Sequence, residues 1–211
     1  MAAQELMDLA DRFNLTTDAQ DRLTTYHDLL AKWQKTVNLV GPRTLEHFWS
    51  RHMLDSLQLL ELVRKHTVEK PSATVADLGT GAGIPGILLA LSGIENMTLV
   101  ESDIRKAAFL REVSRVTETK VTIKNNRIEK IADQKFDLIL ARALAPLSKL
   151  FELSFPISHV NTNFIFPKGL KVDEELNESK TDWQFSCLSH KSLSDETGSI
   201  LEISDLQPKT R

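Results

Sequence analysis

Hydrophobic side chains in the first third of the chain recur every three or four residues, which is the spacing of an amphipathic helix. The pattern predicts helices over residues 3–13, 18–37 and 44–65. A glycine-proline pair at 41–42 separates the last two, because these residues break a helix. We therefore expect residues 1–70 to form a helical extension.

From residue 74 onward, short apolar runs bounded by turn residues alternate with helical patterns. The runs predict buried strands over 75–78, 97–100, 121–123, 136–140 and 163–166, with helices over 85–91, 104–117, 145–155 and 172–183 between or after them. Two segments near the end, 185–188 and 199–203, alternate as an antiparallel hairpin does. This succession predicts an α/β, Rossmann-like unit over residues 71–211, with a mostly parallel sheet, helices on both faces and a terminal antiparallel hairpin.

A glycine-rich turn joins the first predicted strand to its helix. The sequence D-L-G-T-G-A-G runs from Asp77 to Gly83 and places glycines at positions 79, 81 and 83. Glycine allows a positive φ and leaves no Cβ between the backbone and a ligand. In a doubly wound sheet this turn lies at the carboxyl edge, where nucleotides bind. We expect a nucleotide or nucleoside cofactor here, the alternative being a tight turn without a ligand.

Two features favour S-adenosylmethionine (SAM) over a dinucleotide, although residues 81–86 also satisfy the G-x-G-x-x-G fingerprint. Pro85 removes one of the N–H groups that a pyrophosphate would need at the helix start. Asp77 and Glu101 place carboxylates at the ends of two successive strands, which suits ribose hydroxyls and a sulfonium cation. The pattern therefore predicts the SAM-dependent (class I) methyltransferase version of the fold, with Gly79 and Gly81 at the cofactor.

Two further positions complete the predicted cofactor site. Glu101 lies at a strand end about twenty residues past the loop, where a ribose ligand is expected. The alternative for Glu101 is a surface ion pair with Arg105. Ile128 and Glu129 follow the third strand of the unit, so we expect them beside the adenine ring, the isoleucine on its face and the carboxylate at its edge.

Arg142 follows the strand over 136–140, at the position where such transferases hold the acceptor close to the methyl group. A buried arginine without a partner is costly, so we expect its side chain to face the cleft and an anion or polar ligand. The alternative is a salt-bridged residue of the core.

Arg43, Arg51 and His52 form a candidate cationic rim above the cofactor. One hypothesis is that these side chains meet phosphates. The alternative is an ordinary solvated helix face, on which Arg51 and Asp55 pair one turn apart without a functional role.

Composition narrows the choice of partners only slightly. The 211 residues carry a net charge of −3, so a nucleic-acid site must rest on a local patch rather than on a global basic charge. Cys187 is the single cysteine, which excludes an intramolecular disulfide and fits a reducing compartment. The N-terminus has no signal-peptide pattern and no apolar run is long enough to span a bilayer. We expect a cytoplasmic protein that binds neither a metal nor a membrane.

Several short motifs, in this order, resemble the RsmG family, also called glucose-inhibited division protein B, of 16S ribosomal RNA guanine-N7 methyltransferases. The motifs are N-L-V-G-P-R at 38–43, R-H-M-L-D-S at 51–56, D-L-G-T-G-A-G-I-P-G-I at 77–87, V-E-S-D-I-R-K-A-A-F-L-R-E-V at 100–113, R-I-E at 127–129, A-R-A at 141–143 and P-K-G at 167–169. Together the motifs cover roughly residues 30–170. The combination identifies the family far more specifically than any single motif does. The tail after Lys171 resembles the family least.

The resemblance implies SAM as cofactor and 16S ribosomal RNA, or the small ribosomal subunit, as the partner. We expect the protein to be a monomer. It aligns these residues with the family's SAM contacts: Gly79, Ile84, Ile128, Glu129 and Arg142. It places these in motifs that contact RNA or the active site: Arg43, Arg51, His52 and Lys168.

No general base is predicted for this reaction. Guanine N7 carries a lone pair and no proton, so methyl transfer to it leaves no proton to remove, and placement of the reactants supplies the catalysis. We therefore expect no catalytic acid or base, and a positioning or phosphate-binding role for His52. Two alternatives remain: a methyltransferase of a small molecule or protein, and a non-catalytic dinucleotide-binding regulator.

Overall fold

The computed structural model describes residues 2–41, 45 and 47–209, and one seven-stranded sheet forms its centre. The strand order is β3-β2-β1-β4-β5-β7-β6; the strands from β3 to β5 are parallel, and β7 runs antiparallel to both β5 and β6. The strands are β1 (Val75–Leu78), β2 (Met97–Val100), β3 (Thr122–Lys124), β4 (Phe136–Ala141), β5 (Ser158–Lys168), β6 (Trp183–Lys191) and β7 (Ser199–Pro208). The predicted mostly parallel sheet and terminal hairpin are confirmed.

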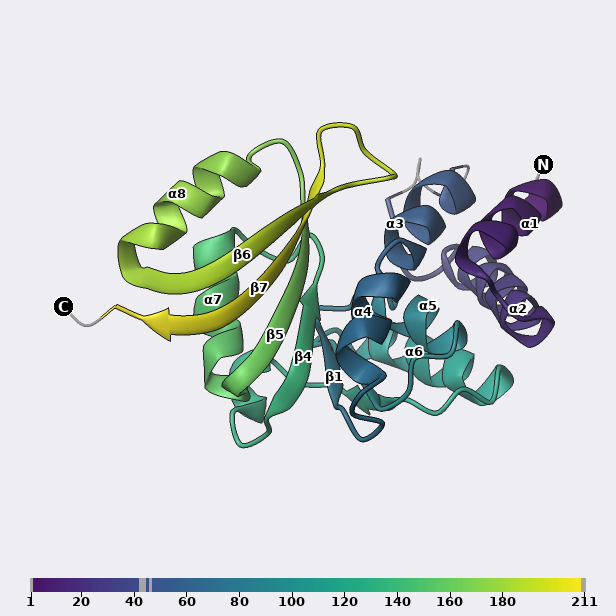
Figure 1. Ribbon diagram of the computed structural model, residues 1–211. Coiled ribbons are helices and arrows are strands. Elements are labelled where there is room, and N and C mark those ends of the chain that lie inside the picture. The colour runs from purple at the N-terminus through teal and green to yellow at the C-terminus, as the bar shows by residue number, and fades with distance from the viewer. Residues whose placement is uncertain (1, 42–44, 46, 210–211) are drawn as a thin grey trace.

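Helices cover both faces of the sheet, and Figure 1 shows the N-terminal helices at one end of the molecule and α8 with the terminal hairpin at the other. The α-helices are α1 (Ala2–Phe13), α2 (Thr17–Trp33), α3 (Leu54–Leu57), α4 (Leu60–Thr67), α5 (Gly86–Leu91), α6 (Ile104–Val116), α7 (Leu147–Ser154) and α8 (Val172–Asp182). The shorter helical turns are η1 (Phe48–Met53), η2 (Ile128–Ile131) and η3 (Phe155–Ile157).

Side chains on the two faces of the central strands pack in two separate hydrophobic cores. Val75 of β1 packs in a cluster that includes Leu23 and Tyr26 of α2, whereas Ala76 and Leu78 pack in a second cluster under α7. All four residues of β1 are buried, as expected for a parallel strand that is covered on both faces. The N-terminal helices therefore share a continuous core with the sheet.

The prediction of one continuous helix over 44–65 is wrong. The segment forms η1, α3 and α4, with breaks around residues 58 and 59. Leu57 and Leu59 are both fully buried, although residues two apart point to roughly opposite sides of a straight helix. The break lets both leucines reach the core.

The second helix also ends earlier than predicted, at Trp33. The side-chain oxygen of Gln34 accepts hydrogen bonds from the backbone N–H groups of Leu39 and Val40, at 2.9 and 3.0 Å. These bonds turn the chain back where the apolar spacing alone suggested another turn of helix. Within the described part of the chain, none of the helices is both long and apolar enough to cross a membrane.

Candidate active site

The carboxyl ends of four parallel strands bring most of the predicted residues to one edge of the sheet. Gly79 follows β1, Glu101 follows β2, Arg142 follows β4, and Lys168 ends β5. Ligands of open α/β sheets bind outside this edge.

The glycine loop has the backbone conformation that its sequence predicts. Gly79, Gly81 and Gly83 have φ values of 63°, 60° and 90°. A Cβ at Gly81 would meet no atom closer than the Gly79 carbonyl oxygen at 4.0 Å, so the space beside Gly81 is open. A cofactor can therefore approach the backbone at this residue.

Asp77 holds the loop from inside and does not face a ligand, contrary to the expectation that it lies beside the ribose. The residue is fully buried, and its Oδ2 accepts hydrogen bonds from Thr80 Oγ1 and from Gly86 N, the latter at 2.8 Å. Burial raises the pKa of Asp77 to about 7. The carboxylate fixes the strand-to-helix turn.

Tyr26 fixes the same loop from the N-terminal helices. Its hydroxyl donates a 2.8 Å hydrogen bond to the Ala82 carbonyl oxygen, and its ring packs against Phe48 and Phe109. Burial raises the pKa of Tyr26 far above its usual range, so it is a neutral donor. Nothing in the sequence indicated this bond between Tyr26 and the loop.

Glu101 lies across the glycine loop in a position that suits a ribose. Its Oε2 accepts from Gly81 N at 2.9 Å and its Oε1 accepts from Asp103 N at 2.7 Å. A carboxylate has about four acceptor sites, so capacity remains for a diol. Asp103, not Glu101, pairs with Arg105, so the predicted alternative of a Glu101–Arg105 pair is wrong.

A cavity of about 450 Å³ opens beyond β2 and β3, lined by Ser102, Asp103, Asn125, Asn126, Arg127 and Lys130. Ile128 and Glu129 begin η2 beside it; Ile128 is buried in the second core and Glu129 is exposed. Ile84, in the glycine loop, is 8 % exposed and belongs to the first core. Cofactor contacts of these three residues remain predictions.

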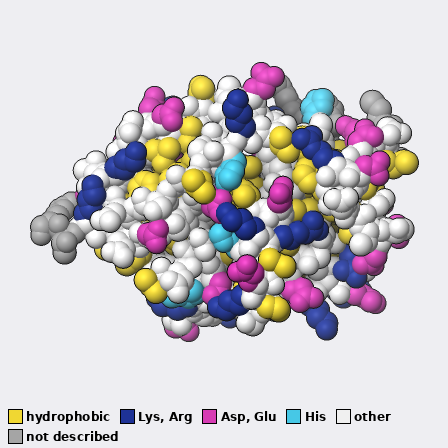
Figure 2. All heavy atoms as spheres, viewed as in Figure 1, with side chains coloured by type: hydrophobic (Ala, Val, Ile, Leu, Met, Phe, Trp, Pro, Cys, Tyr) yellow, Lys and Arg dark blue, Asp and Glu magenta, His cyan; other side chains and the backbone are white. Residues whose placement is uncertain are grey.

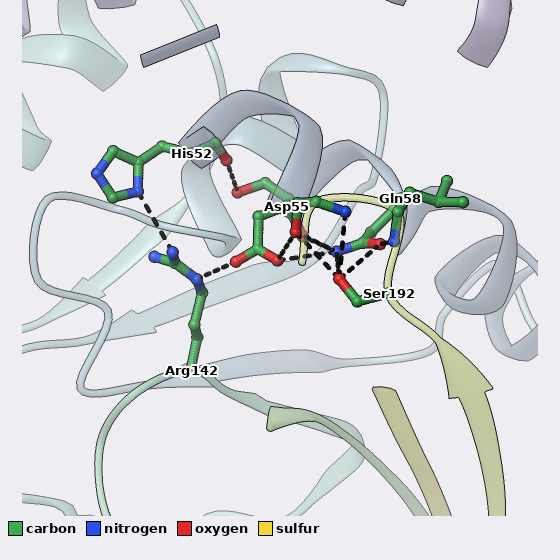
Figure 3. A network of polar contacts seen from close by, with 8 residues as sticks. His52, Asp55, Gln58, Arg142 and Ser192 are labelled. Carbon is green, nitrogen blue, oxygen red and sulfur yellow. Dashed lines mark hydrogen bonds and ion pairs between the residues drawn. The ribbon is translucent and has the colours of Figure 1, made fainter. Parts of the chain in front are cut away.

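Arg142 belongs to a polar network that the sequence did not predict (Figure 3). Its Nε donates to Asp55 Oδ2, and its Nη2 donates to His52 Nδ1 at 3.3 Å. Arg142 also lines a cavity of about 400 Å³ beyond β4 and β5. It therefore lies at the cleft, as predicted, but its ion-pair partner is a carboxylate of this chain. The proposed surface pair of Asp55 with Arg51 is wrong.

Asp55 in turn holds the loop between β6 and β7. Its Oδ1 accepts from Ser194 Oγ at 2.6 Å and from Gln58 Nε2 at 2.8 Å, and Gln58 Oε1 accepts from Leu193 N at 2.7 Å. Figure 3 shows Asp55 between Arg142 and the Gln58–Ser192 side of this network. The acid in R-H-M-L-D-S was visible in the sequence, but its partners are 87 and 139 positions away and no local pattern indicates them.

His52 is buried and uncharged at neutral pH, so its predicted place in a cationic rim is wrong. It is 7 % exposed, and burial, together with the charges of Arg142 and Arg51, lowers its pKa to about 4. Its Nδ1 accepts from Arg142, which leaves the proton on Nε2. The positioning role predicted for His52 agrees with this bond.

Lys168 is also unavailable as a free cation. Its side chain is 8 % exposed, and Nζ forms a 2.7 Å ion pair with Glu175 and donates to the Ala145 carbonyl oxygen at 2.8 Å. Glu175 also accepts from Leu147 N at 2.7 Å, at the start of α7. Lys168 thus joins β5, α7 and α8, and its contact with the RNA backbone stays a prediction that would require this ion pair to open.

Arg51 and Arg43 are the two remaining members of the predicted cationic rim. Arg51 is exposed, and among the described residues no carboxylate forms an ion pair with it. Arg43 lies outside the described residues. The face shown in Figure 2 mixes Lys and Arg with Asp and Glu side chains, in agreement with the net charge of −3.

The fold and the glycine loop define the class: a Rossmann-like, class I SAM-dependent methyltransferase. Two solved structures share the fold. One is a mutant of MtNAS in complex with S-adenosylmethionine, with a TM-score of 0.58 and 16% identity, covering 88% of this chain and 75% of that chain. The other is ribosomal protein L11 methylase from Lactobacillus delbrueckii subsp. bulgaricus, with a TM-score of 0.55 and 24% identity, covering 71% and 78%.

The family follows from sequence comparison. The model of the GidB family, described as rRNA small subunit methyltransferase G, matches residues 19–202, and the chain belongs to this family. A relative named ribosomal RNA small subunit methyltransferase G from Paramagnetospirillum magneticum is 43% identical over 94% of this chain and 95% of its own. One of the same name from Gluconobacter oxydans is 41% identical over 92% and 97%. The predicted family resemblance is confirmed.

Proposed function

We propose that this chain transfers the methyl group of SAM to N7 of a guanine in 16S ribosomal RNA of the small subunit, acting in the cytoplasm as a monomer without a metal. The observation that carries the proposal is the glycine loop: Gly81 has open space beside it and donates its N–H to Glu101, in a chain that belongs to the rRNA small subunit methyltransferase G family.

The residues at the carboxyl edge fit this cofactor. Glu101 has acceptor capacity for ribose hydroxyls, and the cavity next to it, beside Ile128 and Glu129, has room for an adenine ring. Gly79, Gly81 and Ile84 would hold the cofactor at the loop, and Arg142 would orient the cofactor or the acceptor. SAM supplies an electrophilic methyl carbon on its sulfonium sulfur.

The chain's own contribution is placement rather than proton transfer. Guanine N7 attacks with a lone pair, and the guanine takes up the positive charge that the sulfonium loses, so no proton has to be removed at N7. His52 is neutral and bonded to Arg142, which suits a group that orients the guanidinium. Holding the two reactants in line can contribute about 7–11 kcal/mol at best.

We infer that other, exposed cations contact the RNA phosphates, because His52 is bonded to Arg142 and Lys168 is paired with Glu175. Arg51 lies near the loop between β6 and β7, and Arg127 and Lys130 line the cavity beyond β2 and β3. These three side chains are exposed. We expect them, together with Arg43, to hold the RNA backbone.

A methyl-transfer assay with tritiated SAM tests the function. Small-subunit RNA and assembled small subunits should accept label, whereas total protein and small metabolites should not. Borohydride reduction and aniline cleavage should then map the methyl group to N7 of one guanine in RNA from cells with the gene, and not in RNA from cells without it. Label in protein or metabolites, or cleavage that is independent of the gene, would overturn the proposal.

A further inference from the structure

Five charged residues line the cavity of about 400 Å³ beyond β4 and β5: Asp55, Arg142, Lys168, Glu175 and Asp195. Arg142 and Asp55 line it from β4 and α3, and Asp195 lines it from the loop between β6 and β7. The volume falls within the range of about 300–1,000 Å³ that is typical of small-ligand pockets.

Hydrogen bonds hold the loop that carries Asp195. Ser194 donates to Asp55, and Leu193 N donates to Gln58, so the loop is tied to α3. Asp195 Oδ1 accepts from Thr197 N at 2.9 Å and from Thr197 Oγ1 at 2.7 Å. The bonds from Thr197, with the charge of Arg51 nearby, lower the pKa of Asp195, which is therefore a carboxylate at neutral pH.

Asp195 and Arg142 both retain unused hydrogen-bonding capacity. Within the described residues, Asp195 Oδ2 accepts no hydrogen bond. Arg142 has five N–H groups and uses one on Asp55 and one on His52. The residues that line the cavity thus include an unused carboxylate acceptor on Asp195 and unused donors on Arg142.

Guanine matches this arrangement, and adenine does not. In guanine the O6 acceptor lies between N7 and N1–H, and the N1–H and 2-amino donors continue from O6 along the Watson–Crick edge. Adenine has a 6-amino donor in place of O6 and a lone pair in place of N1–H. A base that directs N7 toward the glycine loop would offer O6 to Arg142 and its two donors to Asp195 only if it is guanine.

We propose that Asp195 is a specificity-determining residue that accepts hydrogen bonds from the Watson–Crick edge of the flipped target guanine. The inference rests on the proposed function and deepens it, since it names the residue that separates guanine from adenine at the same site. An enzyme must extrude its target base to act on it, and reading the exposed Watson–Crick edge is a direct way to select that base.

Asp195→Asn tests the proposal. The amide oxygen can still accept from Thr197, so the loop is retained, but the other position becomes an NH₂ donor that opposes the donors of guanine. We expect kcat/KM on small-subunit RNA to fall about 10- to 100-fold, with the Kd for SAM by calorimetry unchanged. Glu196→Ala is the matched control, because Glu196 is an exposed acid of the same loop that does not line the cavity.

An RNA with inosine at the target position separates base recognition from a loop defect, because inosine lacks only the 2-amino group. The wild-type chain should lose activity on inosine RNA, whereas the Asp195→Asn variant should show no further loss. Equal inosine penalties in the two proteins, or equal activity of the Asp195 and Glu196 variants, would overturn the proposal. Absence of transfer by the wild-type chain to guanine RNA would instead overturn the proposed function.

Discussion

Complete burial raises the pKa of Asp77 to about 7. The hydrogen bonds from Thr80 and Gly86 favour the charged form and lower the pKa, but burial outweighs them. The unfolded chain releases this proton near pH 4. Between about pH 4 and 7 the folded chain therefore holds more protons, and the contribution of Asp77 to stability falls as the pH rises. An Asp77→Asn side chain can still accept from Thr80 and Gly86, but it does not titrate.

We expect Asp77→Asn to gain stability relative to the wild type as the pH rises from 4 to 8, by on the order of 4 kcal/mol. Urea unfolding of both proteins at several pH values measures the difference in the free energy of unfolding. A difference that is constant over this interval would show that Asp77 titrates as an ordinary carboxyl group in the folded chain.

The Arg142–Asp55 ion pair should affect methyl transfer through the position of the guanidinium. Side-chain exposures of 20% and 14% leave this pair little solvation to compensate for a lost partner. Removing one member of a buried pair costs more than the pair contributes, because the other charge is left unpaired. Asp55→Ala should therefore lower both stability and activity. Arg142→Ala should mainly lower activity, because Asp55 keeps its hydrogen bonds from Ser194 and Gln58.

For Arg142→Ala we expect a loss of at least about 100-fold in kcat/KM with the fold retained, on the scale of a removed electrostatic contact. Arg142→Lys should not restore activity, since an ammonium cannot bridge Asp55 and His52 as a planar guanidinium does. Methyl-transfer kinetics at saturating SAM, with circular dichroism as the check on folding, measure both variants. Full activity in Arg142→Ala would assign the residue a structural role.

At the scale of elements, an ionic cluster joins α4 to the terminal hairpin. Glu202 of β7 accepts from Lys65 Nζ at 2.8 Å and pairs with His66 and His190 at 2.8 and 2.9 Å. Burial tends to raise the pKa of Glu202, but the bonds from Lys65, His190 and His66 outweigh it and lower the pKa to about 2. A carboxyl group with a lowered pKa stabilises the fold above its unfolded pKa, near 4.3, and less as the pH falls toward 2.

Glu202→Gln should lower the free energy of unfolding at pH 7 by about 1.5–3 kcal/mol, the cost of hydrogen bonds to a charged group. The deficit should shrink as the pH falls from about 4.3 toward 2, where the wild-type carboxylate is lost as well. Denaturant unfolding at pH 7 and pH 3 measures both values. Glu61→Gln, an exposed acid on α4, serves as the control and should change stability by less than about 0.5 kcal/mol.

The elements themselves were largely predictable from sequence, whereas contacts between them were not. Apolar runs such as Phe136–Ala141 identify buried strands, and the φ values of Gly79 and Gly81 follow from the glycine pattern. The helix over 44–65 was predicted as continuous because its break depends on burying Leu57 and Leu59 in one core. Lys168, at the end of β5, looked like a free cation because its partner Glu175 comes from a separate element, helix α8.

At the scale of the whole molecule, the charge balance limits how the chain can bind RNA. A net charge of −3 supplies no general attraction, so affinity must come from the few exposed cations around the site. Each phosphate contact releases a counterion, and for single strands the slope of log K against log salt changes by about 0.7 per contact. We expect a shallow slope that corresponds to Arg43, Arg51, Arg127 and Lys130.

Replacing Arg51, Arg127 and Lys130 together by alanine should lower the magnitude of that slope by about 2, and binding should weaken most at low salt. Filter binding of small-subunit RNA from 50 to 300 mM salt measures the slope. A triple variant of Arg64, Lys120 and Lys180, which are exposed and do not line either site cavity, is the control and should keep the wild-type slope. The opposite result, with an unchanged slope in the first variant and a reduced one in the control, would place the RNA on a different face from the cofactor. The base would then be unable to reach Arg142, so the same measurement also tests whether the carboxyl edge of the sheet receives the substrate.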